Sequence, residues 1–214
     1  MSRMRHARRA TMVSASALAL GACTSFTLTR RRPPTLHRLT PKTTFDADQD
    51  WLGVRVLVEP PSAASGLNTA RIALRPDPTG LDYFADALWV EVVPIMVQVL
   101  LAESLDASGA FDVLSPESIG LRPDFILRAF IREFQADYDD GLSSPPLATV
   151  QLQNRLLRMP RRESMATFSA KEMVRAEGTS LDFIIMAFDE ALGRVQRRIV
   201  EWMIETTGDA TTDI

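Results

Sequence analysis

The sequence predicts an α/β fold: a two-layer sandwich in which two amphipathic helices lie on one face of a mixed, mostly antiparallel sheet. Alternating apolar and polar residues, the pattern of half-buried strands, recur through most of the chain between residues 54 and 174. Two other stretches, 90–107 and 180–208, show helical spacing of their apolar residues instead. About 170 residues remain after the N-terminal segment, which suffices for one domain with a hydrophobic core.

The strands predicted before the first helix are short and end at turn-forming residues. The alternation of three valines with Arg55 and Glu59 indicates a half-buried strand that ends at Pro60–Pro61. In the next strand Ile72 and Leu74 are predicted to face inward. The predicted segments are LHRLTP (36–41, an edge strand), VRVLVEPP (54–61), ARIALRP (70–76) and LDYF (81–84).

The first helix is predicted from about residue 93 to residue 107. Pro94 is compatible with a first turn, where a missing N–H costs little, and Ser108–Gly109 ends the helix. The apolar face is predicted to include Val92, Met96, Val99, Leu100 and Leu105.

An antiparallel meander is predicted after this helix. A short strand, FDVLSP (111–116), precedes three longer alternating runs that are joined by the turns DDGLSSPP and MPRRE. Each run has one apolar and one polar side, so one face of the meander is predicted to be polar. The runs are DFILRAFIREFQADY (124–138), ATVQLQNRLLR (148–158) and SMATFSAKEMV (164–174).

The last helix is the clearest element of the sequence. Thr179 or Ser180 caps it, and Gly208 is predicted to end it. Two i,i+4 ion pairs are predicted on its exposed side, Glu190–Arg194 and Arg197–Glu201. The apolar stripe comprises Ile184, Phe188, Leu192, Val195, Ile199 and Trp202.

The N-terminus has the composition of a bacterial lipoprotein signal. Four arginines precede the small or apolar residues 11–22, a run that is shorter than the ~20 residues needed to span a bilayer. Leu20-Gly21-Ala22-Cys23 then has the form of a lipobox, so we expect cleavage before Cys23 and acylation of its thiol. The alternative is an ordinary signal peptide with an incidental cysteine. The expected parts are a signal peptide (1–22), a lipidated N-terminus with a tether (23–34), a folded domain (35–207) and a tail (208–214).

Localisation and charge narrow the class of partner. Cys23 is the only cysteine of the chain, which suits an oxidising periplasm. Thr24 rather than Asp follows it, which by the usual bacterial sorting rule predicts the periplasmic face of the outer membrane. Without residues 1–22 the chain has 20 basic and 27 acidic residues, a net charge of −7. Residues 43–214 alone have a net charge of −12, which argues against a nucleic-acid partner.

The sequence offers little catalytic chemistry, so we predict no catalytic residue, no metal site and no cofactor other than the lipid on Cys23. The expected mature chain has one histidine, His37, and neither a Gly-x-Ser-x-Gly nor a phosphate-binding glycine motif. A calcium loop would need Glu at the position of Ala148, so a solvated hairpin tip is predicted instead for an acidic cluster. That cluster is Asp137, Asp139, Asp140 and Gly141. Core packing is predicted for Trp89 and Trp202.

Five segments follow the lipobox in a characteristic order: LVEPPSAASGLNTARIALRP (57–76), YFADALWVEVVP (83–94), SGAFDVL (108–114), GLRPDFILRAFIREFQADY (120–138) and FDEALGRVQRRIVEW (188–202). Through them the chain resembles, over residues 35–205, the ABC-type transport auxiliary lipoprotein family, which includes the lipoprotein of the paraquat-inducible (Pqi) system. Two positions depart from the family pattern. Leu36–His37 stands where the family usually has an aromatic residue, and Leu88 replaces an Arg before the tryptophan.

The resemblance implies a non-enzymatic, lipid-anchored subunit of an envelope lipid transporter. The implied partners are an MCE-domain protein and the ABC permease and ATPase of the same system; the membrane is contacted through the acyl chains, and a homo-oligomer is left open. Two other classes fit the same anchor. One is a lipoprotein that activates or chaperones a peptidoglycan synthase or an outer-membrane assembly complex. The other is a lipid-anchored hydrolase, which would need a pocket beside Asp137 or Glu133 where acid, base or nucleophile converge.

Overall fold

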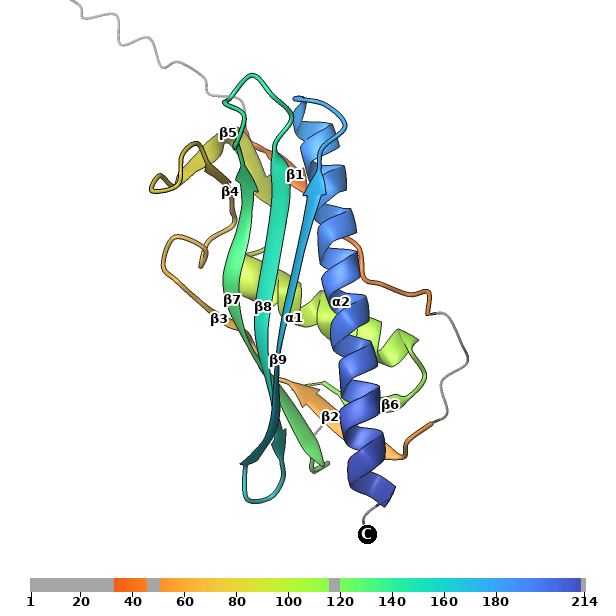
Figure 1. Ribbon diagram of the computed structural model, residues 1–214. Coiled ribbons are helices and arrows are strands. Elements are labelled where there is room, and N and C mark those ends of the chain that lie inside the picture. The colour runs from red at the N-terminus through yellow and green to blue at the C-terminus, as the bar shows by residue number, and fades with distance from the viewer. Residues whose placement is uncertain (1–32, 46–50, 116–119, 213–214) are drawn as a thin grey trace, which may run out of the picture. The chain divides into compact units, whose positions relative to one another are not determined.

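The computed structural model describes residues 33–45, 51–115 and 120–212. Within these residues a nine-stranded mixed sheet carries two helices (Figure 1). Most of its paired length is antiparallel, so the predicted fold class is confirmed. The elements are β1 (Thr35–His37), β2 (Val54–Val58), β3 (Ser62–Ala63), β4 (Arg71–Arg75), β5 (Asp82–Trp89), α1 (Val93–Ala107), β6 (Phe111–Leu114), β7 (Phe125–Asp137), β8 (Leu147–Arg158), β9 (Glu163–Arg175) and α2 (Leu181–Thr212).

The long strand β7 organises the sheet. One of its edges pairs with β8, which in turn pairs with β9, both in antiparallel register, so the predicted meander is confirmed. The other edge pairs in parallel with three short strands in succession: β2 at residues 125–127, β3 at 130–131 and β4 at 135–137. β6 extends β2, while β5 and then β1 extend β4, so the sheet branches into two wings along this edge.

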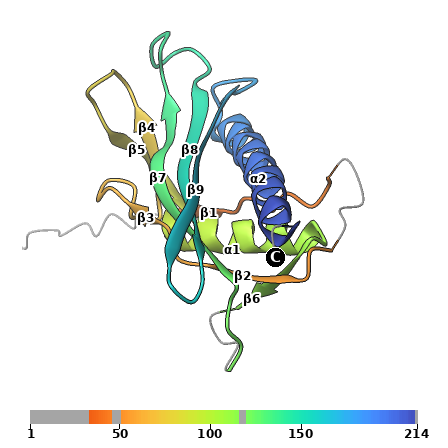
Figure 2. The ribbon, with the colours of Figure 1, turned by 60° about the horizontal axis from the view of Figure 1, so that its bottom comes forward.

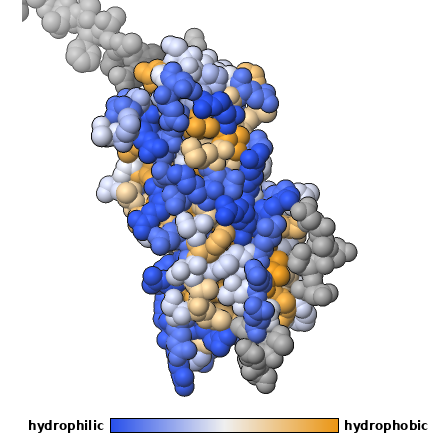
Figure 3. All heavy atoms as spheres, in the orientation of Figure 1, coloured by the Kyte–Doolittle hydropathy of each residue, from blue (hydrophilic) through white to orange (hydrophobic). Residues whose placement is uncertain are grey.

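Both helices lie on the same side of the β7–β9 meander (Figure 2). α1 packs against β2 and β6, and α2 runs along β8 and β9. An aromatic cluster joins α2 to the sheet: the rings of Phe134 and Phe188 stack with centroids 5.5 Å apart, and Trp89 meets both rings edge-on. Trp89 is 1% exposed, which confirms its predicted core position. On the outside, hydrophilic residues cover most of the face seen in Figure 3.

The first helix has the predicted limits but a different buried face. Pro94 lies in its first turn, and Ser108 follows its last residue. Val97 and Leu101 are fully buried, whereas Val99 is 47% exposed, so the prediction for Val99 is wrong. The reason is that apolar residues surround most of α1, and spacing alone then leaves open which of them face the sheet.

The second helix is longer than predicted. It continues to Thr212, so the expected end at Gly208 is wrong. A glycine inside a helix costs only about 1 kcal/mol relative to alanine. The predicted Glu190–Arg194 pair is present, with 2.5 Å between its oxygen and nitrogen. Trp202 is only partly buried and stacks on Phe168 of β9 with ring centroids 5.4 Å apart. Neither of the described helices has the length and apolarity to cross a bilayer.

The β4–β5 wing shows one irregularity that the alternation pattern did not reveal. A bulge interrupts the pairing of β4 with β5 between Arg71 and Ala73; Ile72 is fully buried, and Leu74, opposite the buried Ala136 of β7, is partly buried against the core. The predicted inward position is therefore correct for Ile72 and for Leu74. β5 extends to Trp89, well beyond the predicted LDYF strand.

Candidate functional site

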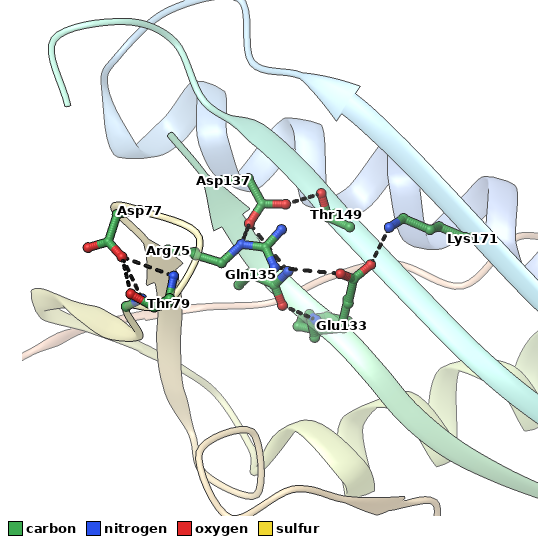
Figure 4. Close-up of polar contacts among 10 residues, drawn as sticks. Arg75, Asp77, Thr79, Glu133, Gln135, Asp137, Thr149 and Lys171 are labelled. Carbon is green, nitrogen blue, oxygen red and sulfur yellow. Dashed lines mark hydrogen bonds and ion pairs between the residues drawn. The ribbon is translucent and has the colours of Figure 1, made fainter. Parts of the chain in front are cut away.

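The outer face of the meander, on the side away from the helices, carries a connected set of charged and polar side chains (Figure 4). Phe134 packs against α2, so its strand neighbours Glu133 and Gln135 point to the opposite face. Residues directly opposite on paired strands lie on the same face. Gln135 is opposite Thr149 of β8, and Asp137 is opposite Arg75 of β4.

Asp137 is the buried centre of this network, with only 1% of its surface exposed. Its Oδ1 atom lies 2.8 Å from Arg75 Nε and accepts a hydrogen bond from Gln135 Nε2 at 3.3 Å. Its Oδ2 atom accepts a hydrogen bond from the Thr149 hydroxyl at 2.5 Å. Because a buried charge is costly without partners, these contacts fix Asp137 in place. They thereby join β4, β7 and β8.

Glu133 extends the network to β9. Its Oε2 atom lies 2.5 Å from Lys171 Nζ, and its Oε1 atom lies 3.7 Å from Arg75 Nη1. The side chains of Arg75 and Lys171 are 33% and 41% exposed, so solvent weakens these outer contacts. The result is a row of alternating charge, from Lys171 through Glu133 and Arg75 to Asp137.

A cavity of about 530 Å³ lies at the end of this row, between the β4–β5 turn and the β7–β8 turn. It is lined by Arg75, Pro76, Asp77, Pro78, Tyr138, Asp139 and Gly141, and not by Asp137 or Glu133. Hydrogen bonds from the Thr79 hydroxyl and from the N–H groups of Thr79 and Gly80 lower the pKa of the Asp77 carboxyl below its ordinary value. Burial raises the pKa of the Tyr138 hydroxyl. The carboxylates of Asp137 and Glu133, by contrast, are engaged by Arg75 and Lys171 within the sheet.

The acidic cluster at the end of β7 does not assemble into a calcium loop. Asp137 is the last residue of β7 and is buried on the outer face, so the predicted solvated hairpin tip is wrong for it; Asp139 is exposed, and the Asp140 carboxylate lies 3.4 Å from Arg175 Nη1. Gly141 has a φ of +84°, a backbone conformation that glycine adopts readily in turns. Over the described ranges, no three metal-ligating side chains lie close enough to hold an ion.

A second hollow of about 670 Å³ lies between residues 40–44, α2 and Glu172 of β9. The Thr40 N–H and hydroxyl donate hydrogen bonds to Asp189, and the Lys42 N–H donates to Ser104 and Gln196. These bonds hold the extended segment 40–44 across both helices.

Charged side chains and a glycine shape this hollow. Arg198 Nη1 donates to Glu172 at 2.9 Å and to the Lys171 carbonyl at 3.1 Å. Gly193 leaves open space, since a Cβ atom there would have no neighbour within 4 Å. This hollow was not predicted from the sequence because its walls come from three distant segments. A mid-helix glycine beside three arginines was the one available signal.

The predicted lipidation site lies outside the described residues, as do the lipobox residues Leu20, Gly21, Ala22 and Cys23. The described chain enters the sheet through β1, where Leu36 is opposite Leu88 of β5 and His37 is opposite Trp89. The residues that depart from the family pattern, Leu36–His37 and Leu88, therefore lie side by side where β1 pairs with β5. Leu36 is 60% exposed, which leaves an apolar side chain on the outer face of this wing.

Replacing Asp137 with alanine is expected to lower the free energy of unfolding by about 2–4 kcal/mol. The change leaves the buried Thr149 hydroxyl without its acceptor and removes the closest partner of Arg75. The partial exposure of Arg75 keeps the expected loss below that of a fully buried pair. Urea unfolding measures the effect, with Asp139→Ala as the matched control. The exposed Asp139 is expected to cost less than about 0.5 kcal/mol, and equal losses for both variants would contradict the role of the network.

Comparison with known proteins shows which family and which solved structures the chain resembles. Residues 35–200 match the family described as the ABC-type transport auxiliary lipoprotein component, which confirms the predicted resemblance. The fold is similar to that of protein XCC0632 from Xanthomonas campestris, described as a DUF330 protein. The two are 26% identical with a TM-score of 0.72, and the match covers 84% of this chain and 97% of that one. A second solved structure, of an uncharacterized protein, is 11% identical with a TM-score of 0.63, covers 80% and 99% of the two chains, and shares the fold alone.

A search of curated proteins found no significant match. The family match nevertheless spans well over half of the sequence. The chain therefore belongs to the ABC-type transport auxiliary lipoprotein component family, and is a membrane-anchored lipoprotein of the cell envelope that serves an ABC-type transport system.

Proposed function

We propose that the chain is the lipid-anchored auxiliary subunit of an ABC/MCE-type envelope lipid transport system, and that it couples the periplasmic component to the outer membrane. The observation that carries the proposal is the family match over residues 35–200. The lipobox that ends at Cys23, together with Thr24 after it, supports an acylated N-terminus at the outer membrane. Residues 24–34 then form the tether that leads to β1.

In this function the domain acts by binding rather than by catalysis. The carboxylates of Asp137 and Glu133 are engaged by Arg75 and Lys171 within the sheet. Groups that neutralise one another in this way stabilise the fold and are poorly placed to transfer protons to a substrate. The partners are the MCE-domain protein, the permease and the ATPase of the same system.

Co-purification tests this function. The mature protein, extracted with its acyl chains intact, is expected to recover the MCE-domain protein and, through it, the permease and ATPase. The matched control carries the same signal, Cys23 and tether in front of an unrelated folded domain, and is expected to recover none of them. Recovery of a peptidoglycan synthase or an outer-membrane assembly complex instead would favour the alternative function.

A further inference from the structure

The outer face of the sheet is positively charged in a domain that is otherwise strongly acidic. Residues 43–214 have a net charge of −12. Eight basic side chains nevertheless lie on or contact this face, against six acidic ones. The basic residues are Arg55, Arg75, Arg128, Arg132, Arg155, Arg162, Lys171 and Arg175, and the acidic residues are Glu59, Asp112, Asp124, Glu133, Asp137 and Asp140. Charge is therefore segregated onto this face.

The segregation is strongest in an arginine patch formed by Arg128, Arg132, Arg155 and Arg162. Arg128 and Arg155 are directly opposite on β7 and β8. Like charges in that position repel each other. One carboxylate, that of Glu59, forms ion pairs with two residues of the patch. Its Oε2 atom lies 2.7 Å from Arg128 Nη2, and its Oε1 atom lies 2.9 Å from Arg162 Nη2.

The other two arginines of the patch have no acidic partner among the described residues. Arg132 donates from Nε and Nη2 to the neutral Gln153 amide oxygen, at 3.0 and 2.6 Å, and its guanidinium lies 4.5 Å from the ring centroid of Phe130. Arg155 is exposed and makes no ion pair within the described part of the chain. Four guanidinium groups thus share one carboxylate, and the sheet holds them in place.

We infer that the arginine patch is a docking surface for an acidic segment of a partner protein. A guanidinium group binds a carboxylate through two parallel hydrogen bonds, and its planar geometry makes the pairing selective. A carboxylate from a partner, placed between Arg128 and Arg155, would also reduce the repulsion between these two guanidinium groups. No large exposed apolar side chain lies on residues 125–132 or 153–162. Recognition at this surface therefore depends on charge.

The position of the patch favours a protein over the membrane that holds the anchor, a step that rests on the proposed function. The chain enters the sheet at β1, beside the wing that pairs with residues 135–137 of β7. The patch occupies residues 128–132 and extends to the β8–β9 turn at the other end of the meander. At about 3.3 Å per residue, the near edge of the patch lies roughly 10 Å along β7 from that wing, and its far end at the β8–β9 turn lies roughly 40 Å away.

Binding of a defined peptide tests the inference. The mature chain with Cys23→Ser, which stays in solution, is titrated into a fluorescent 12-residue peptide rich in Glu and Asp, and into the matching Gln and Asn peptide. We expect binding of the acidic peptide alone, weakening as salt increases. The double variant Arg132→Gln/Arg155→Gln is expected to weaken binding at least tenfold. The control Arg175→Gln/Arg194→Gln, with the same change of net charge at exposed sites outside the patch, is expected to change it less than twofold. Circular dichroism verifies that both variants are folded.

Three outcomes would overturn the inference. Equal weakening by both double variants would show that only net charge matters. Binding to phosphatidylglycerol vesicles that the patch variant alone abolishes, without peptide binding, would assign the patch to a membrane. Self-association that the patch variant alone abolishes would assign it to a second copy of the chain. Peptide binding needs no transport component, so a failed co-purification beside intact peptide binding would reject the proposed function only.

Discussion

Replacing Cys23 with serine is expected to release the mature chain completely from the envelope membrane. A hydroxyl is not acylated in its place, and each buried methylene of an acyl chain contributes about 0.8 kcal/mol to anchoring, so two chains hold a protein stably. The arginines of the tether add only about 1 kcal/mol each near anionic lipids, and neither described helix can cross a bilayer. Fractionation of the envelope followed by immunoblotting measures the release.

The serine variant has to be delivered by an ordinary cleavable signal, because loss of Cys23 also removes the lipoprotein cleavage site. The matched control is Thr24→Asp, which keeps the acyl chains and is expected to leave the chain in the inner membrane by the sorting rule. A serine chain that still sediments with membranes at high salt, in cells that keep their permeability barrier, would contradict the assignment of Cys23 as the anchor.

Truncating Phe188 to alanine is expected to lower the free energy of unfolding by about 3–5 kcal/mol. Phe188 is fully buried, its ring stacks on Phe134 of β7, and it meets Trp89 of β5 edge-on at 5.4 Å. The substitution leaves a cavity where α2 packs on the sheet. Urea unfolding, followed by circular dichroism and by tryptophan fluorescence, measures the loss.

Phe183 provides the control for this experiment on the same helix. It is 40% exposed, so Phe183→Ala is expected to cost less than about 1 kcal/mol. Phe188→Leu restores much of the lost volume and is expected to recover part of the loss. If Phe188→Ala and Phe183→Ala cost the same small amount, the aromatic cluster does not hold α2 to the sheet.

The types of the long elements were predictable because periodicity is a local property of the chain. The alternation of Phe125, Leu127, Ala129 and Ile131 identifies β7, and all four are buried as predicted. The edge strand β1 also forms, with Leu36 and His37 in the position of the family's aromatic residue. Two predictions failed because packing in the folded chain overrides the local residue pattern. Val99 fits the apolar spacing of α1 and is exposed, and Gly208 is a stop signal that α2 passes.

The charged network and the arginine patch could not be predicted because their members are distant in sequence. Asp137 looks like part of an exposed acidic turn, yet it is buried against Arg75 of another strand. Arg128 and Arg155 look like ordinary residues of a polar face. Only the register between β7 and β8 places them opposite each other.

By itself, the sequence determined the expected anchor on Cys23, the order of strands and helices, and the family, because each depends on residues that are neighbours along the chain or on their linear order. The tertiary structure alone decided which carboxylates are buried and paired, which side of α1 meets the sheet, and where the arginines of the patch gather. These depend on distances through space, which only the pairing of strands and the packing of helices establish.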